Sequence, residues 1–207
     1  VAEGTSADVD AAVAAARSAF ATWSTTPVDI RAKYLRDIGA ALTARFDEIA
    51  DTISAEVGSP KSFGQKIQAG LSDGEWESFA ALVEGYEWEQ QVGNSLVVRE
   101  PIGVVGAITP WNYPLYLIIC KVVPAIASGC TVVLKPSEVT PLNAYLLTEV
   151  IDEVGLPAGV FNMVVGKGTV VVRVQGGEWV LNAGDTTTID EIASHGSRSG
   201  STTPAPT

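Results

Sequence analysis

In the N-terminal half of the chain, apolar residues recur with the period of an α-helix. The pattern predicts a helix over residues 6–23, with Ser6 or Asp8 as its cap, and one long helix over residues 29–58. A third helix, rich in aromatic residues, is expected over residues 65–88. The positions expected to form the core of this helical layer are Val9, Val13, Ala16, Phe20, Trp23, Ile30, Tyr34, Ile38, Leu42, Phe46, Ile49 and Ile53.

The period changes in the C-terminal half, where residues 95–101 predict a strand. Residues 103–108 form a short continuous apolar run, typical of a strand buried on both faces, and residues 131–134 and 160–165 predict two more strands. Helices are expected between them over residues 114–128 and 140–154. The order β-α-β-α-β with short connections predicts a parallel sheet with right-handed crossovers. The expected fold class is therefore α/β, an N-terminal helical layer followed by a parallel βαβαβ Rossmann-like sheet.

Local signals mark the ends of these elements. Thr140 followed by Pro141 has the pattern of a cap and a first helical residue, and Gly155 is expected to end the same helix. Beyond the third parallel strand, residues 170–174 are compatible with a further strand, and residues 177–180 with one side of a hairpin.

Composition and charge narrow the classes of function. The 207 residues are 46% hydrophobic, enough for a sizeable core, and carry a net charge of −11. Such a surface repels phosphate backbones and anionic lipids, so neither nucleic acid nor a membrane surface is expected as a partner. Lys121 and Pro124 interrupt the longest apolar run, so no helix is expected to cross a bilayer.

The few cysteine and histidine residues limit the chemistry further. Cys120 and Cys130 lie in apolar surroundings and are expected to be buried packing residues. Two cysteines do not make a disulfide framework, and the chain opens without the pattern of a secretion signal, so a cytoplasmic location is expected. His195, the only histidine, falls in the Ser/Gly/Thr-rich C-terminal segment, and no metal site is expected.

Candidate binding residues follow each of the three parallel strands, at the sheet edge where ligands bind in folds of this class. Asn112, set between two prolines, offers a fixed amide suited to stabilising an oxyanion, although its spacing by itself favours a turn or helix-cap residue. Lys135 and Glu138 suit hydrogen bonds to a nucleotide ribose, or a solvated ion pair. Gly166 and Gly168 resemble the start of a dinucleotide-binding loop that lacks its third glycine.

Four segments together resemble the NAD(P)-dependent aldehyde dehydrogenase family. They are PIGVVGAITPWNYP at 101–114, KVVPAIASG at 121–129, TVVLKPSE at 131–138 and GLPAGVFN at 155–162. The resemblance extends from about Ala2 to Gly168, and the preceding helices look like the family's first helical layer. On this basis residues 1–170 are interpreted as part of an NAD(P)-binding domain, residues 171–192 as a hairpin of uncertain origin, and residues 193–207 as a disordered tail.

The resemblance implies roles for the matching positions. Asn112 would hold the oxyanion together with a backbone N–H of the nucleophilic cysteine, and Lys121 would lie near the reaction centre. Lys135 and Glu138 would bind the adenosine ribose, with Glu138 favouring NAD and NADP remaining an alternative. The further cofactor-binding positions would be Ile108, Thr109, Pro110, Trp111, Asn112, Ser137, Gly166 and Gly168.

The sequence departs from the family pattern after Gly168. The family has a glycine four places later, where this chain has Val172, and neither the Glu-Leu-Gly-Gly motif of the general base nor the nucleophilic-cysteine motif occurs. The expectation is therefore an incomplete fold and a truncated enzyme, inactive alone. Its parent would be a homo-oligomer that oxidises a small-molecule aldehyde to a carboxylic acid through a thiohemiacetal and a thioester. The alternatives are a non-catalytic nucleotide-binding module and a non-functional fragment.

Overall fold

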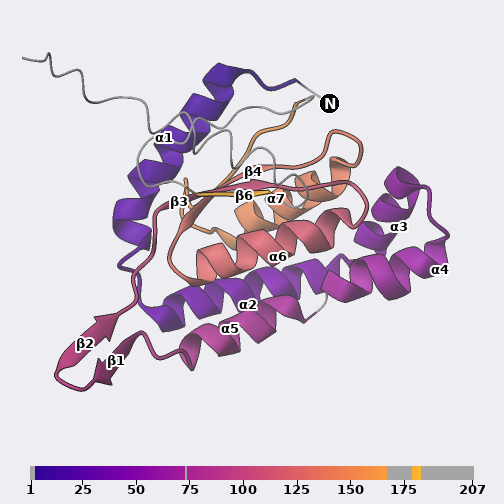
Figure 1. Ribbon diagram of the computed structural model, residues 1–207. Coiled ribbons are helices and arrows are strands. Elements are labelled where there is room, and N and C mark those ends of the chain that lie inside the picture. The colour runs from indigo at the N-terminus through magenta and orange to yellow at the C-terminus, as the bar shows by residue number, and fades with distance from the viewer. Residues whose placement is uncertain (1–2, 73, 167–178, 183–207) are drawn as a thin grey trace, which may run out of the picture.

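The computed structural model describes residues 3–72 and 74–166, together with the backbone of 179–182 (Figure 1). In chain order the described elements are α1 (Ser6–Trp23), α2 (Val28–Ala44), α3 (Phe46–Val57), α4 (Lys61–Phe63), the π-helix η1 (Gly64–Ala69), the 3₁₀-helix η2 (Gly70–Ser72), α5 (Glu75–Glu84), β1 (Glu89–Val92), β2 (Ser95–Val98), β3 (Val104–Ile108), α6 (Pro114–Ala127), β4 (Thr131–Lys135), α7 (Leu142–Val154), β5 (Phe161–Met163) and β6 (Trp179–Asn182).

A parallel sheet with the strand order β5-β4-β3-β6 forms the centre of the fold. The α/β class and the three predicted strands are confirmed as β3, β4 and β5, joined through α6 and α7. β3 and β4 are buried, whereas the residues of β5 are partly exposed. The strand predicted near residues 177–180 is present as β6, but it pairs in parallel with β3. The remaining residues of the predicted hairpin, the strand at 170–174 and the tail at 193–207 lie outside the described residues.

The sheet separates two apolar cores because successive side chains of a strand point to opposite faces. Val104 and Val133 contact α1 through Val9 and Ala16. The alternate positions of β3 and β4 face the larger core with α6 and α7, and α2, α3 and α5 complete that core. Figure 1 shows this order of layers, with α1 on one side of the sheet and α6, then α2 and α5, on the other.

Helix α1 has the predicted bounds but a different cap. Thr5, rather than Ser6 or Asp8, occupies the N-cap position. The Asp8 carboxylate accepts hydrogen bonds from the Thr5 N–H and hydroxyl, both at 2.7 Å, and the Thr5 hydroxyl oxygen accepts from the Asp8 N–H at 3.4 Å. This reciprocal capping box lowers the pKa of Asp8, chiefly through the backbone hydrogen bond.

The long helix predicted over residues 29–58 is two helices, α2 and α3. The break falls at Arg45, whose backbone leaves the helical region at φ −103° and ψ 18°. Its guanidinium reaches Glu48 at 2.8 Å and Glu149 on α7 at 3.0 Å. The apolar period continues across this break, and neither glycine nor proline marks it, so the sequence pattern did not reveal it. Among the predicted core positions, Ile30 is 41% exposed and does not belong to the core.

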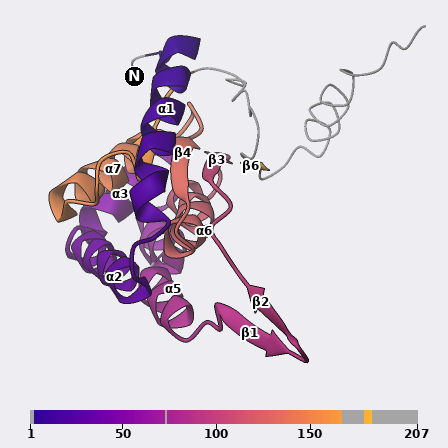
Figure 2. The same ribbon diagram turned by 90° about the vertical axis from the view of Figure 1, so that its left-hand side faces the viewer.

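The helix predicted over residues 65–88 is also wrong as one element. It divides into η1, η2 and α5, because Gly74 adopts a positive φ of 83° that other residues avoid, and Gly85 ends α5. The strand predicted over residues 95–101 is β2, which pairs antiparallel with β1. Figure 2 shows this hairpin projecting away from the layered body.

Helix α7 begins at Leu142, with Pro141 in the N-cap position, so the predicted cap at Thr140 is wrong. The cap comes instead from α3, where the Glu56 carboxylate accepts the Leu142 N–H at 2.6 Å and the Asn143 N–H at 3.2 Å. Gly155 ends the helix in a left-handed conformation, as predicted. Within the described residues, no helix is both long and apolar enough to cross a membrane.

Candidate functional site

The carboxyl edge of the sheet brings the ends of β3 and β4 together. Ile108 pairs with Lys135 in the parallel register, and the Thr109 N–H donates to the Lys135 carbonyl at 3.2 Å. On its other side β3 pairs with β6, so the sheet extends in both directions from β3. Ligands in open α/β sheets bind at such a switch point, outside the carboxyl ends of the strands.

Lys135 and Glu138 form an ion pair at this edge, with 2.9 Å between Nζ and Oε2. The Lys135 side chain is only 8% exposed, whereas that of Glu138 is 43% exposed. A buried ammonium group is costly unless it is paired, so Lys135 needs the Glu138 carboxylate as its partner. The buried Lys135 in turn holds the exposed Glu138 carboxylate in place. The Ser137 hydroxyl oxygen accepts the Val139 N–H at 3.2 Å and shapes the loop that carries Glu138.

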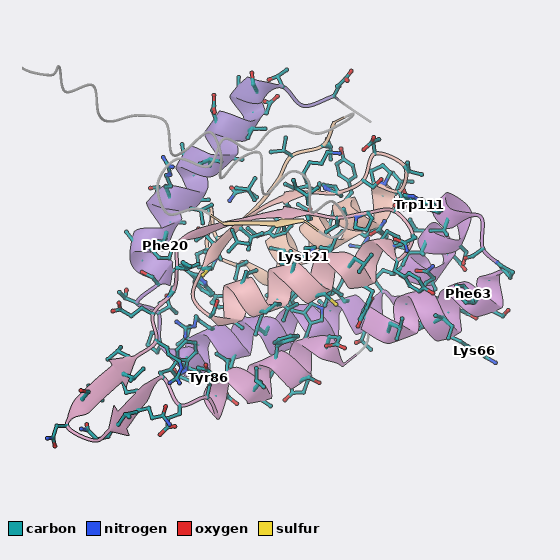
Figure 3. The ribbon with its side chains drawn as sticks, in the orientation of Figure 1. Phe20, Phe63, Lys66, Tyr86, Trp111 and Lys121 are labelled. Atoms are coloured by element: carbon teal, nitrogen blue, oxygen red, sulfur yellow. The ribbon has the colours of Figure 1, made fainter. Side chains whose placement is uncertain are left out.

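Asn112 lies on the turn between β3 and α6 and is exposed. Its neighbour Trp111, labelled in Figure 3, is exposed as well. Tyr113 occupies the N-cap of α6, with no side-chain capping bond, so Asn112 is not the helix cap. The turn is held from outside. Gln68 donates from Nε2 to the Asn112 carbonyl at 3.0 Å, and Thr140 donates from its hydroxyl to the Trp111 carbonyl at 3.3 Å.

The remaining predicted site residues, Lys121, Gly166 and Gly168, are not part of this cluster at the ends of β3 and β4. Lys121 lies on α6, about 10 Å along the helix axis from its first residue. It is half-buried, and loss of solvation lowers the pKa of its ammonium against an opposing effect of the Cys120 thiol. Figure 3 shows it apart from Trp111. Gly166 is buried just beyond β5, and Gly168 lies outside the described residues.

The two cysteines differ in their surroundings. Cys130 is buried as predicted, with its sulfur 3.6 Å from the Ser128 hydroxyl. The prediction for Cys120 is wrong, since it is exposed on the face of α6 that turns away from the core. Its hydrogen bond with Tyr116 raises the pKa of that phenol. Among the described residues, no group of three His, Cys, Asp or Glu side chains is arranged to hold a metal.

Four polar residues that support the site were not predicted for this role: Glu56, Gln68, Thr140 and Asn143. The only sequence signal among them was the Thr-Pro pair at residues 140–141, which indicated a cap. Their contacts join segments far apart in the chain, which periodicity does not detect.

A family model described as "Aldehyde dehydrogenase family" matches residues 1–201. The chain belongs to the aldehyde dehydrogenase family. The resemblance drawn from the four sequence motifs is thereby confirmed, and the fold of solved family members agrees with the layered architecture seen here.

This chain corresponds to only one part of each aldehyde dehydrogenase relative. The 3-succinoylsemialdehyde-pyridine dehydrogenase of a Pseudomonas species is 48% identical over 166 residues, 80% of this chain and 35% of that protein. Aldehyde dehydrogenase C from Pseudomonas syringae, solved as a mutant with NAD+ and octanal, has a TM-score of 0.79 and 48% identity over 81% of this chain and 35% of its own. Betaine aldehyde dehydrogenase from Staphylococcus aureus, solved with NAD+, has a TM-score of 0.78 and 34% identity, with the same coverage. The chain thus spans about 35% of the length of these relatives.

Proposed function

We propose that this chain forms the cofactor-binding part of an NAD-dependent aldehyde dehydrogenase. The observation that carries the proposal is the Glu138 carboxylate, which the ion pair with Lys135 holds at the carboxyl edge of the sheet. The exposed turn that contains Asn112 follows β3 at the same edge. Solved family members at 48% and 34% identity contain NAD+, which supports the same cofactor here.

Glu138 and Lys135 suit the adenosine ribose of NAD. A carboxylate accepts hydrogen bonds from both ribose hydroxyls, and an ammonium with three donors retains others after binding Glu138. The same carboxylate repels the 2′-phosphate of NADP, so NAD is favoured. The Thr109 hydroxyl at this edge is buried and has no hydrogen-bond partner among the described residues, which fits a site that a polar ligand completes.

Asn112 is proposed to donate its side-chain amide to the oxygen of the aldehyde as negative charge develops there. Such a donor is effective when its position is fixed before the reaction, and removal of one donor typically costs about 3 kcal/mol in the barrier. Bound NAD would supply the hydride acceptor for the oxidation. The small-molecule aldehyde would approach the exposed side of the Asn112 turn.

The chemical step is proposed for a longer family protein rather than for these residues alone. The sequence contains no Glu-Leu-Gly-Gly motif, Cys130 is buried, and Cys120 lies on the outer face of α6 beside Tyr116. Neither cysteine has a His, Asp or Glu close to it in the sequence that could act as the base of a cysteine nucleophile. The chain by itself is therefore expected to bind NAD without oxidising aldehydes.

Calorimetric titration with NAD tests this proposal. Glu138→Ala should weaken binding roughly 10- to 100-fold, since a hydrogen bond to a charged group contributes about 1.5–3 kcal/mol. Glu89→Ala, which removes an exposed carboxylate from the hairpin, is the matched control and should leave binding unchanged. Equal NAD affinity in the Glu138→Ala and Glu89→Ala variants, or no saturable binding by the folded chain, would contradict the proposal.

A further inference from the structure

We propose that Gln68 and Thr140 are positioning residues for Asn112. Each buried side chain donates to a carbonyl of the exposed turn, Gln68 to that of Asn112 at 3.0 Å and Thr140 to that of Trp111 at 3.3 Å. The inference rests on the oxyanion role proposed for Asn112 and extends it to residues from two other parts of the chain.

The turn needs donors from outside because its own sequence is poor in them. Pro110 and Pro114 flank it and have no backbone N–H, so the chain there does not continue a regular ladder of hydrogen bonds. Asn112 itself is exposed, and its side chain is not fixed by burial. The Trp111 carbonyl belongs to the peptide group before the Asn112 Cα, and the Asn112 carbonyl to the peptide group after it. Because each peptide group is planar, holding both carbonyls fixes the backbone on either side of that Cα and so sets the direction in which the Asn112 side chain leaves it.

Gln68 is built for this contact. It is 2% exposed on η1, and burial of an amide is costly unless it is hydrogen-bonded. The Oε1 atom of Gln68 has no hydrogen-bond partner among the described residues. Within those residues, the side chain is therefore held by the hydrogen bond from its Nε2 to the Asn112 carbonyl. The helix η1 packs tightly on α3, since a Cβ on Gly64 would lie 1.9 Å from the Ser54 hydroxyl oxygen. Irregular π-turns of this kind often occur at functional sites.

Thr140 is also connected to α3, through hydrogen bonds of Asn143. Its carbonyl accepts from Asn143 Nδ2 at 2.7 Å, and the same Asn143 nitrogen lies 3.0 Å from the Glu56 carboxylate on α3. Thr140 and Asn143 are each 1% exposed. Helix α3 therefore supports both donors, through η1 for Gln68 and through Glu56 for Thr140, and gives the Asn112 turn one common frame.

The arrangement also links the turn to the cofactor loop. Thr140 follows Glu138 closely in sequence, and the loop between them is fixed at its other end by the Lys135 ion pair. A displacement of about 1 Å is enough to reduce an enzyme's rate by two orders of magnitude. η1 holds the Asn112 turn on one side, and the loop at residues 136–140 holds it on the other. This arrangement would keep the distance between the Asn112 amide and the bound cofactor constant.

The sequence allows a direct test by NMR, since Trp111-Asn112 is its only Trp-Asn pair and Asn112-Tyr113 its only Asn-Tyr pair. A chain labelled with ¹³C-carbonyl Trp and ¹⁵N-Asn gives one correlation that reports the Trp111 carbonyl. Labelling with ¹³C-carbonyl Asn and ¹⁵N-Tyr reports the Asn112 carbonyl in the same way. Loss of a hydrogen bond moves a carbonyl carbon signal upfield.

Two near-isosteric variants remove one donor each. Gln68→Met should shift the Asn112 carbonyl signal upfield, and Thr140→Val should shift that of Trp111. The controls are Gln91→Met and Thr25→Val, which remove exposed side chains that donate to backbone carbonyls elsewhere, and neither should move the two signals. Should Gln68→Met not fold, Gln68→Asn provides the same readout, because the shorter amide does not reach the turn.

Unchanged carbonyl signals in folded Gln68→Met and Thr140→Val would overturn the proposal, even if both variants are less stable, because a merely structural role lowers stability without releasing the carbonyls. The readout requires no NAD, so it is separate from the titration that tests the proposed function. In a longer family protein that carries this segment, the same variants should lower kcat and leave the KM for NAD unchanged, whereas loss of stability alone would change neither constant of the folded enzyme.

Discussion

The strands β2 and β4 are rich in the same residues and have opposite environments. β4 reads TVVLK, and every one of its residues is buried. β2 reads SLVV, and every one is exposed, with Leu96 at 56% and Val98 at 50%. The difference lies in their neighbours, since α1 covers one face of β4 and α6 the other, whereas the hairpin extends from the body (Figures 1 and 2).

This contrast teaches that residue type predicts a strand, while the covering elements decide what the strand can do. A strand fixed on both faces holds the residues at its end in constant positions, which a binding site requires. Lys135 is the last residue of β4 and is buried together with it, so its ammonium anchors Glu138. The hairpin has the same β-propensity but provides no such frame.

The largest difference between the two strands should be seen in stability. Leu134→Ala removes a fully buried side chain from β4 and should lower the free energy of unfolding by about 2–5 kcal/mol. Leu96→Ala makes the same change on the exposed hairpin and should alter it by no more than about 0.5 kcal/mol. Urea unfolding followed by circular dichroism measures both. Similar losses from the two variants would remove the basis of the comparison.

A smaller effect is expected from the cap that ties α7 to α3. Glu56→Ala removes the acceptor of the Leu142 and Asn143 N–H groups and should cost about 1–2 kcal/mol of unfolding free energy. Glu56→Gln keeps one acceptor oxygen and should cost less. The hairpin variant Glu89→Ala serves as the reference for loss of an exposed carboxylate, and a Glu56→Ala chain as stable as this reference would show that the cap is unimportant.

Periodicity predicted much of the layered body. The parallel strands and helices α1, α6 and α7 follow from local runs of apolar residues, and glycines such as Gly155 mark their ends. The polar edge residues follow from the rule that ligands bind at the carboxyl ends of parallel strands. Lys135 and Glu138 were accordingly placed next to each other from the sequence, and the structure brings them to 2.9 Å.

What the sequence did not predict depends on contacts across the chain. Arg45 breaks a helix without glycine or proline and reaches Glu149 on a distant helix. Glu56 caps a helix that begins many residues later, and Gln68 supports a turn in another layer. Cys120 was expected to be buried because its neighbours are apolar, but the helical period places it on the outer face of α6.

The most direct test of the central claim is amide hydrogen exchange with and without NAD. Binding slows globally exchanging amides everywhere, so the comparison uses amides that exchange by local opening. The account predicts that NAD slows such exchange at residues 108–113 and 135–140, while residues 89–98 of the hairpin exchange as before. Exchange that NAD leaves unchanged at the sheet edge, or slows equally in the hairpin, would contradict the assignment of the cofactor site to the carboxyl ends of β3 and β4.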